Sequence, residues 1–137
     1  MLIGTHSRGI DPKNRLVIPP DMREAFIGGG YISDQGRYVG LFPAQEFRDF
    51  VARIQHDVEA KVVSRKLLQR VGASSHAFGL DTAGRVLLPA NLRGLLPSDG
   101  DVLLAGAFSH VAVWDPTQYE AQDMPRDDFA DQLEAYG

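Results

Sequence analysis

The sequence lacks cysteine and long hydrophobic runs, and both absences narrow what the protein can be. Without cysteine, the 137-residue chain has no disulfide, no thiolate metal site and no cysteine nucleophile. No apolar run approaches the roughly 20 residues that a membrane-spanning helix needs. The first residues, MLIGTHSRGID, also lack the charged start and apolar block of a secretory signal. We therefore expect a cytoplasmic protein.

The common sequence signatures of enzymes are also missing. The chain contains no GxSxG, no P-loop and no GxGxxG motif. His6 and His76 have no second histidine or carboxylate at a standard ligand spacing such as HxxxH. We therefore expect no catalytic residue, no metal and no cofactor, and a metal-dependent hydrolase is the weakest alternative.

The charge is unevenly distributed along the chain. The formal net charge is -4, but residues 1–93 carry 13 Lys and Arg against 9 Asp and Glu, a net charge of +4. Residues 94–137 carry only Arg126 against 9 acids, a net charge of -8. Because a basic face and an acidic end can coexist in one chain, the acidic total does not exclude an anionic polymer as partner.

One stretch of sequence occurs twice. DPKNRLVIPPDMR, residues 11–23, returns as DTAGRVLLPANLR, residues 81–93, at an offset of 70. The offset also superposes His6 on His76 and Gly9 on Gly79. A fixed period of this kind predicts that the chain is built from two copies of one structural unit.

The start of each repeat predicts a hairpin turn. Asp11 can accept hydrogen bonds at the first turn position, Pro12 has the φ of the second, and Asn14 tolerates positive φ. Gly84 occupies the position equivalent to Asn14, and glycine also adopts positive φ at low cost. We therefore expect Asp11 and Asp81 to be turn acceptors rather than catalytic acids.

The remaining pattern predicts β-turn-β-α-β-β in each copy. Pro19 and Pro20 cannot donate to a sheet but suit a helix start. The expected strands are 2–10, 15–18, 31–33 and 37–42 in the first copy, and 102–108 and 110–114 in the second; the expected short helices are 21–26 and 90–95. A longer helical stretch should run from 44 to about 71, with a break near Ala60. The acidic end should be a short exposed helix or a disordered tail.

One such unit is too small for a stable core, so pairing the two copies is the simplest solution. We expect a mainly β fold with helices, of the α+β class, in which interleaved hairpins form a pseudo-twofold barrel. The expected units are a first repeat at 1–50, a connecting helical segment at 51–72, a second repeat at 73–119 and an acidic tail at 120–137.

The two D-x-x-G/N-R signatures, each followed by Pro and then Arg, resemble the MraZ family of bacterial regulators of the division and cell-wall gene cluster. The resemblance extends to SRKLLQRVGASSH before the second signature and to VAVWDPTQY near the end. It implies swapped hairpins like those of AbrB-type regulators. It further implies a nucleoid-associated repressor that binds double-stranded DNA at direct promoter repeats as a ring-shaped homo-oligomer, for which an octamer is one candidate.

The candidate DNA contacts are basic residues in and around the two signatures: Arg8, Lys13, Arg15, Arg23, Arg85 and Arg93. The first copy is expected to bind more strongly, because Ala83 replaces Lys13 in the second. The family usually has Lys-Gly-Arg in the first signature, where this chain has Asn14 in place of glycine. Arg15 and Arg85 could instead pair with the turn aspartates, and Arg23 and Arg93 could form structural ion pairs. A scaffold that assembles without DNA is the main alternative function.

Overall fold

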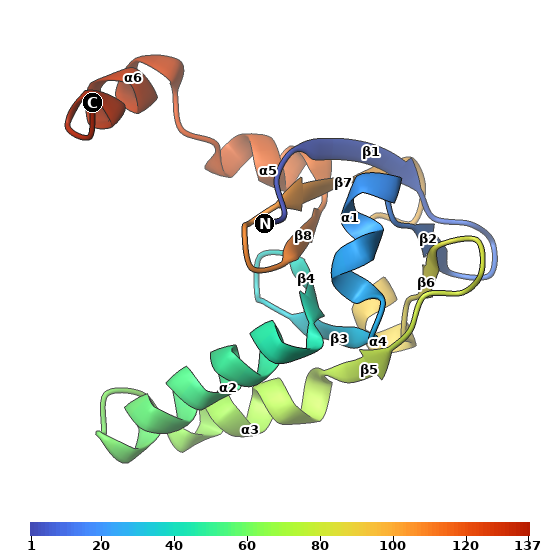
Figure 1. The fold of residues 1–137 in the computed structure, drawn as a ribbon, viewed down its shortest axis with the longest axis horizontal. Coiled ribbons are helices and arrows are strands. Elements are labelled where there is room, and N and C mark those ends of the chain that lie inside the picture. The colour runs from blue at the N-terminus through green and yellow to red at the C-terminus, as the bar shows by residue number, and fades with distance from the viewer.

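The chain forms a six-stranded antiparallel sheet, a separate two-stranded ribbon and several helices (Figure 1). The computed structural model describes residues 1–137. The strands are β1 Thr5–Gly9, β2 Arg15–Val17, β3 Gly30–Asp34, β4 Val39–Pro43, β5 His76–Phe78, β6 Arg85–Leu87, β7 Asp101–Gly106 and β8 Val111–Trp114. The helices are α1 Pro20–Arg23, the 3-10 helix η1 Glu24–Phe26, α2 Ala44–Glu59, α3 Arg65–Ser74, α4 Ala90–Arg93, α5 Pro116–Gln122 and α6 Arg126–Glu134. The α+β class and the predicted order of elements are confirmed.

The two repeats exchange strands. The sheet order is β1-β7-β8-β4-β3-β5, so β1 of the first repeat pairs with β7 of the second, and β5 of the second pairs with β3 of the first. The central pair, β4 and β8, joins one repeat to the other, and the ribbon pairs β2 with β6. This order is symmetric about the β4–β8 pair. The hairpins are therefore interleaved, as the repeat predicted.

The strands do not close into the expected barrel. The ribbon and the sheet are separate hydrogen-bonded ladders, and one isolated bridge, between Ile10 and Leu16, joins them. The strands β2 and β6 have only three residues each. Proline explains why they are short, because Pro19 and Pro89 follow them closely and have no N–H to donate to a ladder.

The main hydrophobic core lies between the sheet, the ribbon and the short helices. Leu16, Ile18, Val86 and Leu88 alternate along the ribbon strands and the residues that follow them, and all four are buried. Phe26 of η1 packs in the same cluster. Burial of each large side chain contributes about 1.5–3 kcal/mol, so the inner face of the ribbon is firmly anchored.

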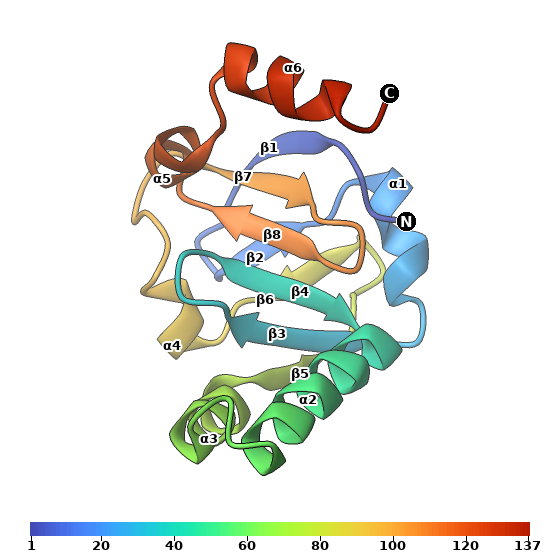
Figure 2. The ribbon, with the colours of Figure 1, turned by 90° about the vertical axis from the view of Figure 1, so that its left-hand side faces the viewer.

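Two helical arms extend from the sheet. The helices α2 and α3 pack side by side, and residues 60–64 separate them at the break predicted near Ala60. Phe42, Phe47 and Val71 form a second small core that holds this pair against the sheet. At the other end of the molecule lies α6 (Figure 2), and every one of its residues is exposed. None of the helices is both long and apolar enough to cross a membrane.

Candidate functional site

The outward face of the β2–β6 ribbon carries both signature arginines. In the antiparallel register Arg15 lies opposite Leu87 and Val17 lies opposite Arg85. Because side chains alternate along a strand, these four share one face, while Leu16 and Val86 point into the core. Leu87 is 63% exposed. The ribbon thus presents two arginines around an apolar centre.

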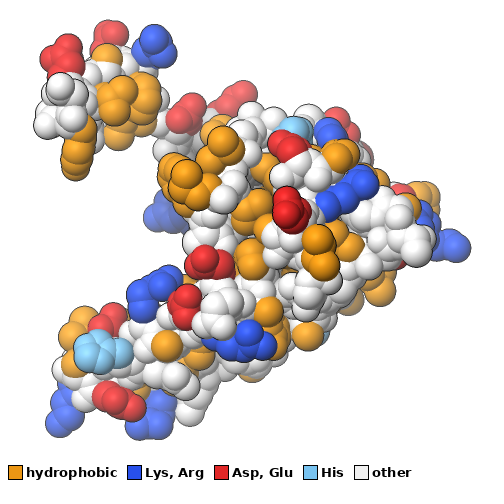
Figure 3. Space-filling view, viewed as in Figure 1, with side chains coloured by type: hydrophobic (Ala, Val, Ile, Leu, Met, Phe, Trp, Pro, Cys, Tyr) orange, Lys and Arg blue, Asp and Glu red, His pale blue; other side chains and the backbone are white.

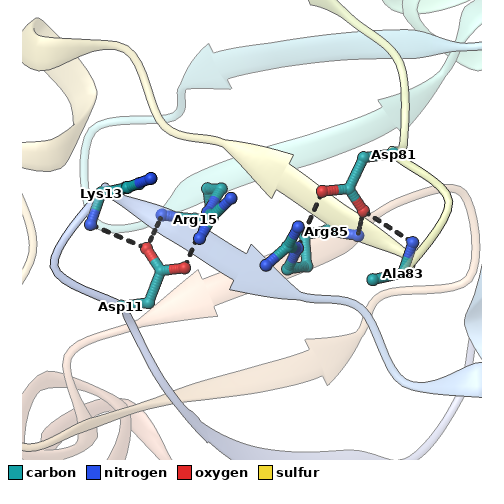
Figure 4. A network of polar contacts seen from close by, with 6 residues as sticks. All are labelled: Asp11, Lys13, Arg15, Asp81, Ala83 and Arg85. Carbon is teal, nitrogen blue, oxygen red and sulfur yellow. Dashed lines mark hydrogen bonds and ion pairs between the residues drawn. The ribbon is translucent and has the colours of Figure 1, made fainter.

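In the first repeat, Asp11 holds both the turn and its arginine. One carboxylate oxygen, Oδ1, accepts hydrogen bonds from the backbone N–H groups of Lys13 at 2.9 Å and Arg15 at 2.8 Å. The other, Oδ2, accepts from Nε of Arg15 at 2.7 Å (Figure 4). Asp11 therefore fixes the direction in which the guanidinium leaves the turn.

The second repeat contains the same network. Asp81 accepts from the N–H groups of Ala83 and Arg85, each at 2.9 Å, and from Nε of Arg85 at 2.7 Å. In both repeats Nε is the only guanidinium nitrogen that donates to the aspartate, and the terminal Nη nitrogens donate no hydrogen bond within the chain. Both arginine side chains are 30% exposed. The pairing of Arg15 and Arg85 with the turn aspartates, which was the alternative to DNA contact, is thus present. It still leaves the Nη groups available to a ligand.

The networks keep the two aspartates charged. The hydrogen bond from the Arg15 backbone N–H is the main cause that lowers the pKa of Asp11 below its ordinary value, with smaller contributions from the Arg15 side chain and the Lys13 N–H. The Arg85 backbone N–H likewise lowers the pKa of Asp81. Each carboxylate therefore remains a hydrogen-bond acceptor at neutral pH.

The two turns are joined to each other as well. The Ile18 N–H donates to the Gly84 carbonyl at 2.9 Å, and the Leu88 N–H donates to the Asn14 carbonyl at 2.8 Å. Asn14 has φ 61° and Gly84 has φ 75°, the positive values expected at both positions. Each turn is therefore held in place by the strand of the other repeat.

The twofold symmetry fails at Arg23 and Arg93. Nε of Arg23 donates to the Ile18 carbonyl at 2.7 Å, and its guanidinium lies directly against Gly84, where a Cβ atom would overlap it. Arg93 instead turns toward its own loop and donates to the Pro97 carbonyl at 2.8 Å. Asn14 already has a Cβ at the position equivalent to Gly84. Structural ion pairs, the alternative to DNA contact for these arginines, do not form within the chain, because both bind backbone carbonyls and neither contacts a carboxylate.

The other two candidate cations lie beside the first hairpin. Lys13 is exposed in the turn itself. Arg8 lies in β1, and one of its terminal nitrogens donates to the Ser7 carbonyl at 2.8 Å. The structure thus brings Arg15 and Arg85 together on one ribbon, places Lys13 at one end of it, and uses Arg23 as a support behind the second turn.

Sequence reasoning missed two features of the molecule. It did not assign Val17 and Leu87 to the exposed face, although alternation from the buried Leu16 and Val86 would have placed them there. It also missed a polar contact on the sheet, where the Tyr38 hydroxyl and Nε2 of His110 lie 2.8 Å apart. Burial lowers the pKa of His110 and raises the pKa of Tyr38. The pair is 72 residues apart in sequence: Tyr38 precedes β4, His110 precedes β8, and only the antiparallel pairing of these two strands brings the side chains together.

Comparison with known proteins identifies relatives that match most of the chain. A family model described as "MraZ protein, putative antitoxin-like" matches residues 72–135. A protein named "Transcriptional regulator MraZ" from Salinispora arenicola is 33% identical over 96% of this chain and 94% of its own length. A protein of the same name from Thiobacillus denitrificans is 33% identical over 89% of this chain and 86% of its own. A third, from Mycoplasmoides gallisepticum, is 30% identical over 88% and 85%.

Proposed function

Since this chain belongs to the MraZ family of transcriptional regulators, we propose that it represses transcription by binding DNA through its β2–β6 ribbon. Membership of a family of transcriptional regulators also agrees with the expectation that the chain is not an enzyme. The proposed targets are direct repeats in the promoter of the division and cell-wall gene cluster, as the resemblance of the signatures implies. Binding there makes the protein nucleoid-associated.

The observation that supports this proposal most strongly is the shared outward face of Arg15 and Arg85 (Figure 4). A two-stranded antiparallel ribbon fits the major groove of DNA, where arginine can bind guanine through O6 and N7. Each guanidinium is oriented by its aspartate through Nε, so its Nη groups can donate to a base edge or a phosphate. Little side-chain entropy is then lost on binding, because the geometry exists beforehand.

The first hairpin is proposed to be the stronger half of the interface. Each Asp–Arg pair is neutral overall, so the additional positive charge there comes from Lys13 and, beside it, Arg8. The second hairpin has Ala83 in place of Lys13. Phosphate contacts by such cations raise affinity for any DNA sequence, while the ribbon arginines can supply specificity.

The small size of the ribbon supports the proposed assembly of several subunits into a ring. Two strands of three residues can contact only a few base pairs, which gives little affinity alone. Several subunits that engage neighbouring direct repeats gain affinity through effective concentration. The alternative of a scaffold without DNA contact does not account for two oriented arginines on an exposed ribbon. These arginines therefore favour the DNA-binding function.

The test is a titration of promoter DNA at several salt concentrations with wild type, Arg15→Ala and Arg85→Ala. Loss of a phosphate contact should lower the salt slope by roughly one unit, and loss of a guanine contact should cost on the order of 1–3 kcal/mol and relax specificity at one base. Arg15→Ala should weaken binding more than Arg85→Ala. Arg53→Ala, on the exposed side of α2, is the matched control and should bind like wild type.

A second variant distinguishes the loss of an Arg15–DNA contact from a new repulsion between the Asp11 carboxylate and the DNA. Arg15→Ala leaves the Asp11 carboxylate without its partner, so the variant also gains a negative charge beside the DNA. Asp11→Asn combined with Arg15→Ala removes that charge and keeps a side-chain oxygen for the turn. If the double variant recovers wild-type affinity, Arg15 does not contact DNA and the proposed interface is wrong.

A further inference from the structure

The C-terminal helix α6 contacts no other part of its own chain closely enough to bury a residue. All residues from Arg126 to Glu134 are exposed, and the helix stands apart from the sheet in Figure 1. Phe129 is 49% exposed and Leu133 is 53% exposed, and Tyr136 continues the same side. Figure 3 shows hydrophobic side chains gathered on this helix. A nine-residue helix is marginal alone, so α6 needs a surface to pack against.

A groove of suitable character lies at the opposite end of the molecule. It has a volume of about 500 Å³ and lies between α2, α3, the β3–β4 turn and the segment after α4. Phe50, Ile54 and Val71 form its apolar wall, while Leu67 and Leu95 are exposed at its edge. An exposed apolar groove of this kind is typical of an interaction site.

The charges of the helix and the groove are complementary. Beside its apolar side, α6 carries only one cation, Arg126, against four acids: Asp127, Asp128, Asp131 and Glu134. Arg70 of α3 lines the groove, and Arg65 and Lys66 are further exposed cations of the same helix. Arg70 makes only a long contact with Asp34, at 3.8 Å, and its side chain is 80% exposed. Complementary fields orient an encounter and select the correct partner.

We propose that α6 of one copy docks into the α2–α3 groove of the next copy, with Phe129 and Leu133 against Leu67 and Leu95. The occupant is a second copy, because α6 and the α2–α3 groove of the same chain lie at opposite ends of the molecule in both views (Figures 1 and 2). Such a contact joins two different surfaces, so its repetition forms a ring when the rotation between neighbouring copies closes. The inference rests on the proposed oligomer and assigns its interface.

Cross-linking tests this contact directly, because the chain has no cysteine of its own. We would introduce Leu95→Cys and Leu133→Cys singly and together, oxidise the protein and separate the products on a non-reducing gel. The double variant should give a ladder of covalent multimers, and a mixture of the two single variants should give dimers. Leu95→Cys with Asp131→Cys, on the opposite side of α6, is the matched control and should remain mostly monomeric on the gel.

The possible outcomes distinguish the interface from the oligomer. Light scattering of the reduced variants gives the subunit number independently of any cross-link. A multimer that forms no ladder would overturn the α6 interface and leave the proposed oligomer standing. A monomer of about 15 kDa for the unmodified chain would overturn both. A cross-linked monomer of altered mobility would show that α6 folds onto its own groove, which also contradicts the proposal.

Discussion

In the proposed DNA-binding ribbon, Gly84 leaves room for Arg23, which occupies the space that a side chain at residue 84 would need. A Cβ atom at residue 84 would overlap Nε and Cζ of Arg23, and Gly84 also has φ 75°. Gly84→Ala should therefore incur two costs. The positive φ costs a residue with a side chain about 1–2 kcal/mol. Displacement of Arg23 removes its charged hydrogen bond to the Ile18 carbonyl, worth about 1.5–3 kcal/mol.

The expected total is about 2.5–5 kcal/mol, which corresponds to a fall in Tm of roughly 10–20 °C for a chain of this length. In an Arg23→Ala background only the cost of the positive φ remains, so Gly84→Ala should then destabilise by about 1–2 kcal/mol. The coupling between the two positions is expected to be about 1.5–3 kcal/mol.

Denaturant unfolding of the wild type, both single variants and the double variant measures this coupling, at one protein concentration because assembly affects apparent stability. Asn14→Ala is the control, since that position already has a Cβ and no arginine behind it. A coupling below about 0.5 kcal/mol would show that Arg23 does not pack against Gly84.

Three further predictions concern the same turns and the half-buried His110. Asn14→Gly should have the melting temperature and DNA affinity of wild type. Asn14→Val should lose about 1–2 kcal/mol of stability at the positive φ and should bind DNA more weakly. Equal binding by the valine variant would show that the turn does not direct Arg15. Asp11 and Asp81 have lowered pKa values, so their stabilisation is complete above the unfolded value near 3.8 and is lost as the pH falls through the folded values. Acid unfolding of Asp11→Asn/Asp81→Asn should depend less on pH below about 4 than that of wild type, and parallel curves would contradict this assignment. The pKa of His110 is also lowered, so the stability of the protein should decrease as the pH falls below the ordinary value of 6.5. Between pH 7 and 5, the Tm of His110→Gln should depend less on pH than the Tm of wild type. An unchanged slope of Tm against pH would assign the effect to another group.

Local chemistry in the sequence was sufficient to predict the hairpin turns. Asp11, Pro12 and Asn14 form a turn whose requirements depend on neighbouring residues alone, and the repeat supplied an independent second example at Asp81 and Gly84. The start of the long helical stretch at residue 44 was also predictable locally, because proline precedes it at residue 43. The interleaved pairing followed from symmetry, because neither repeat could bury its own strand edges.

Features that depend on contacts across the chain could not be predicted in the same way. The ribbon does not close a barrel because β2 and β6 are short. Their lengths are set by packing as well as by Pro19 and Pro89. Arg23 can lie against Gly84, 61 residues away in sequence, because glycine has no Cβ there. Arg93 would meet the Cβ of Asn14, 79 residues away, at the equivalent position and turns in a different direction. The limits of the two repeats at 1–50 and 73–119 and the roles of the six candidate cations stay predictions.

The exchange of strands sets the order in which the chain can fold during synthesis. Thr5 of β1 pairs with Ala105 of β7, and Ser7 bonds Asp101 across 94 residues. At a synthesis rate of about 5–20 residues per second, β1 waits roughly 5–20 s for its partner. The sheet cannot be completed until β8, which ends at Trp114, has left the ribosome. The first repeat therefore spends this interval with unpaired strand edges, and folding of the two repeats is a single late event.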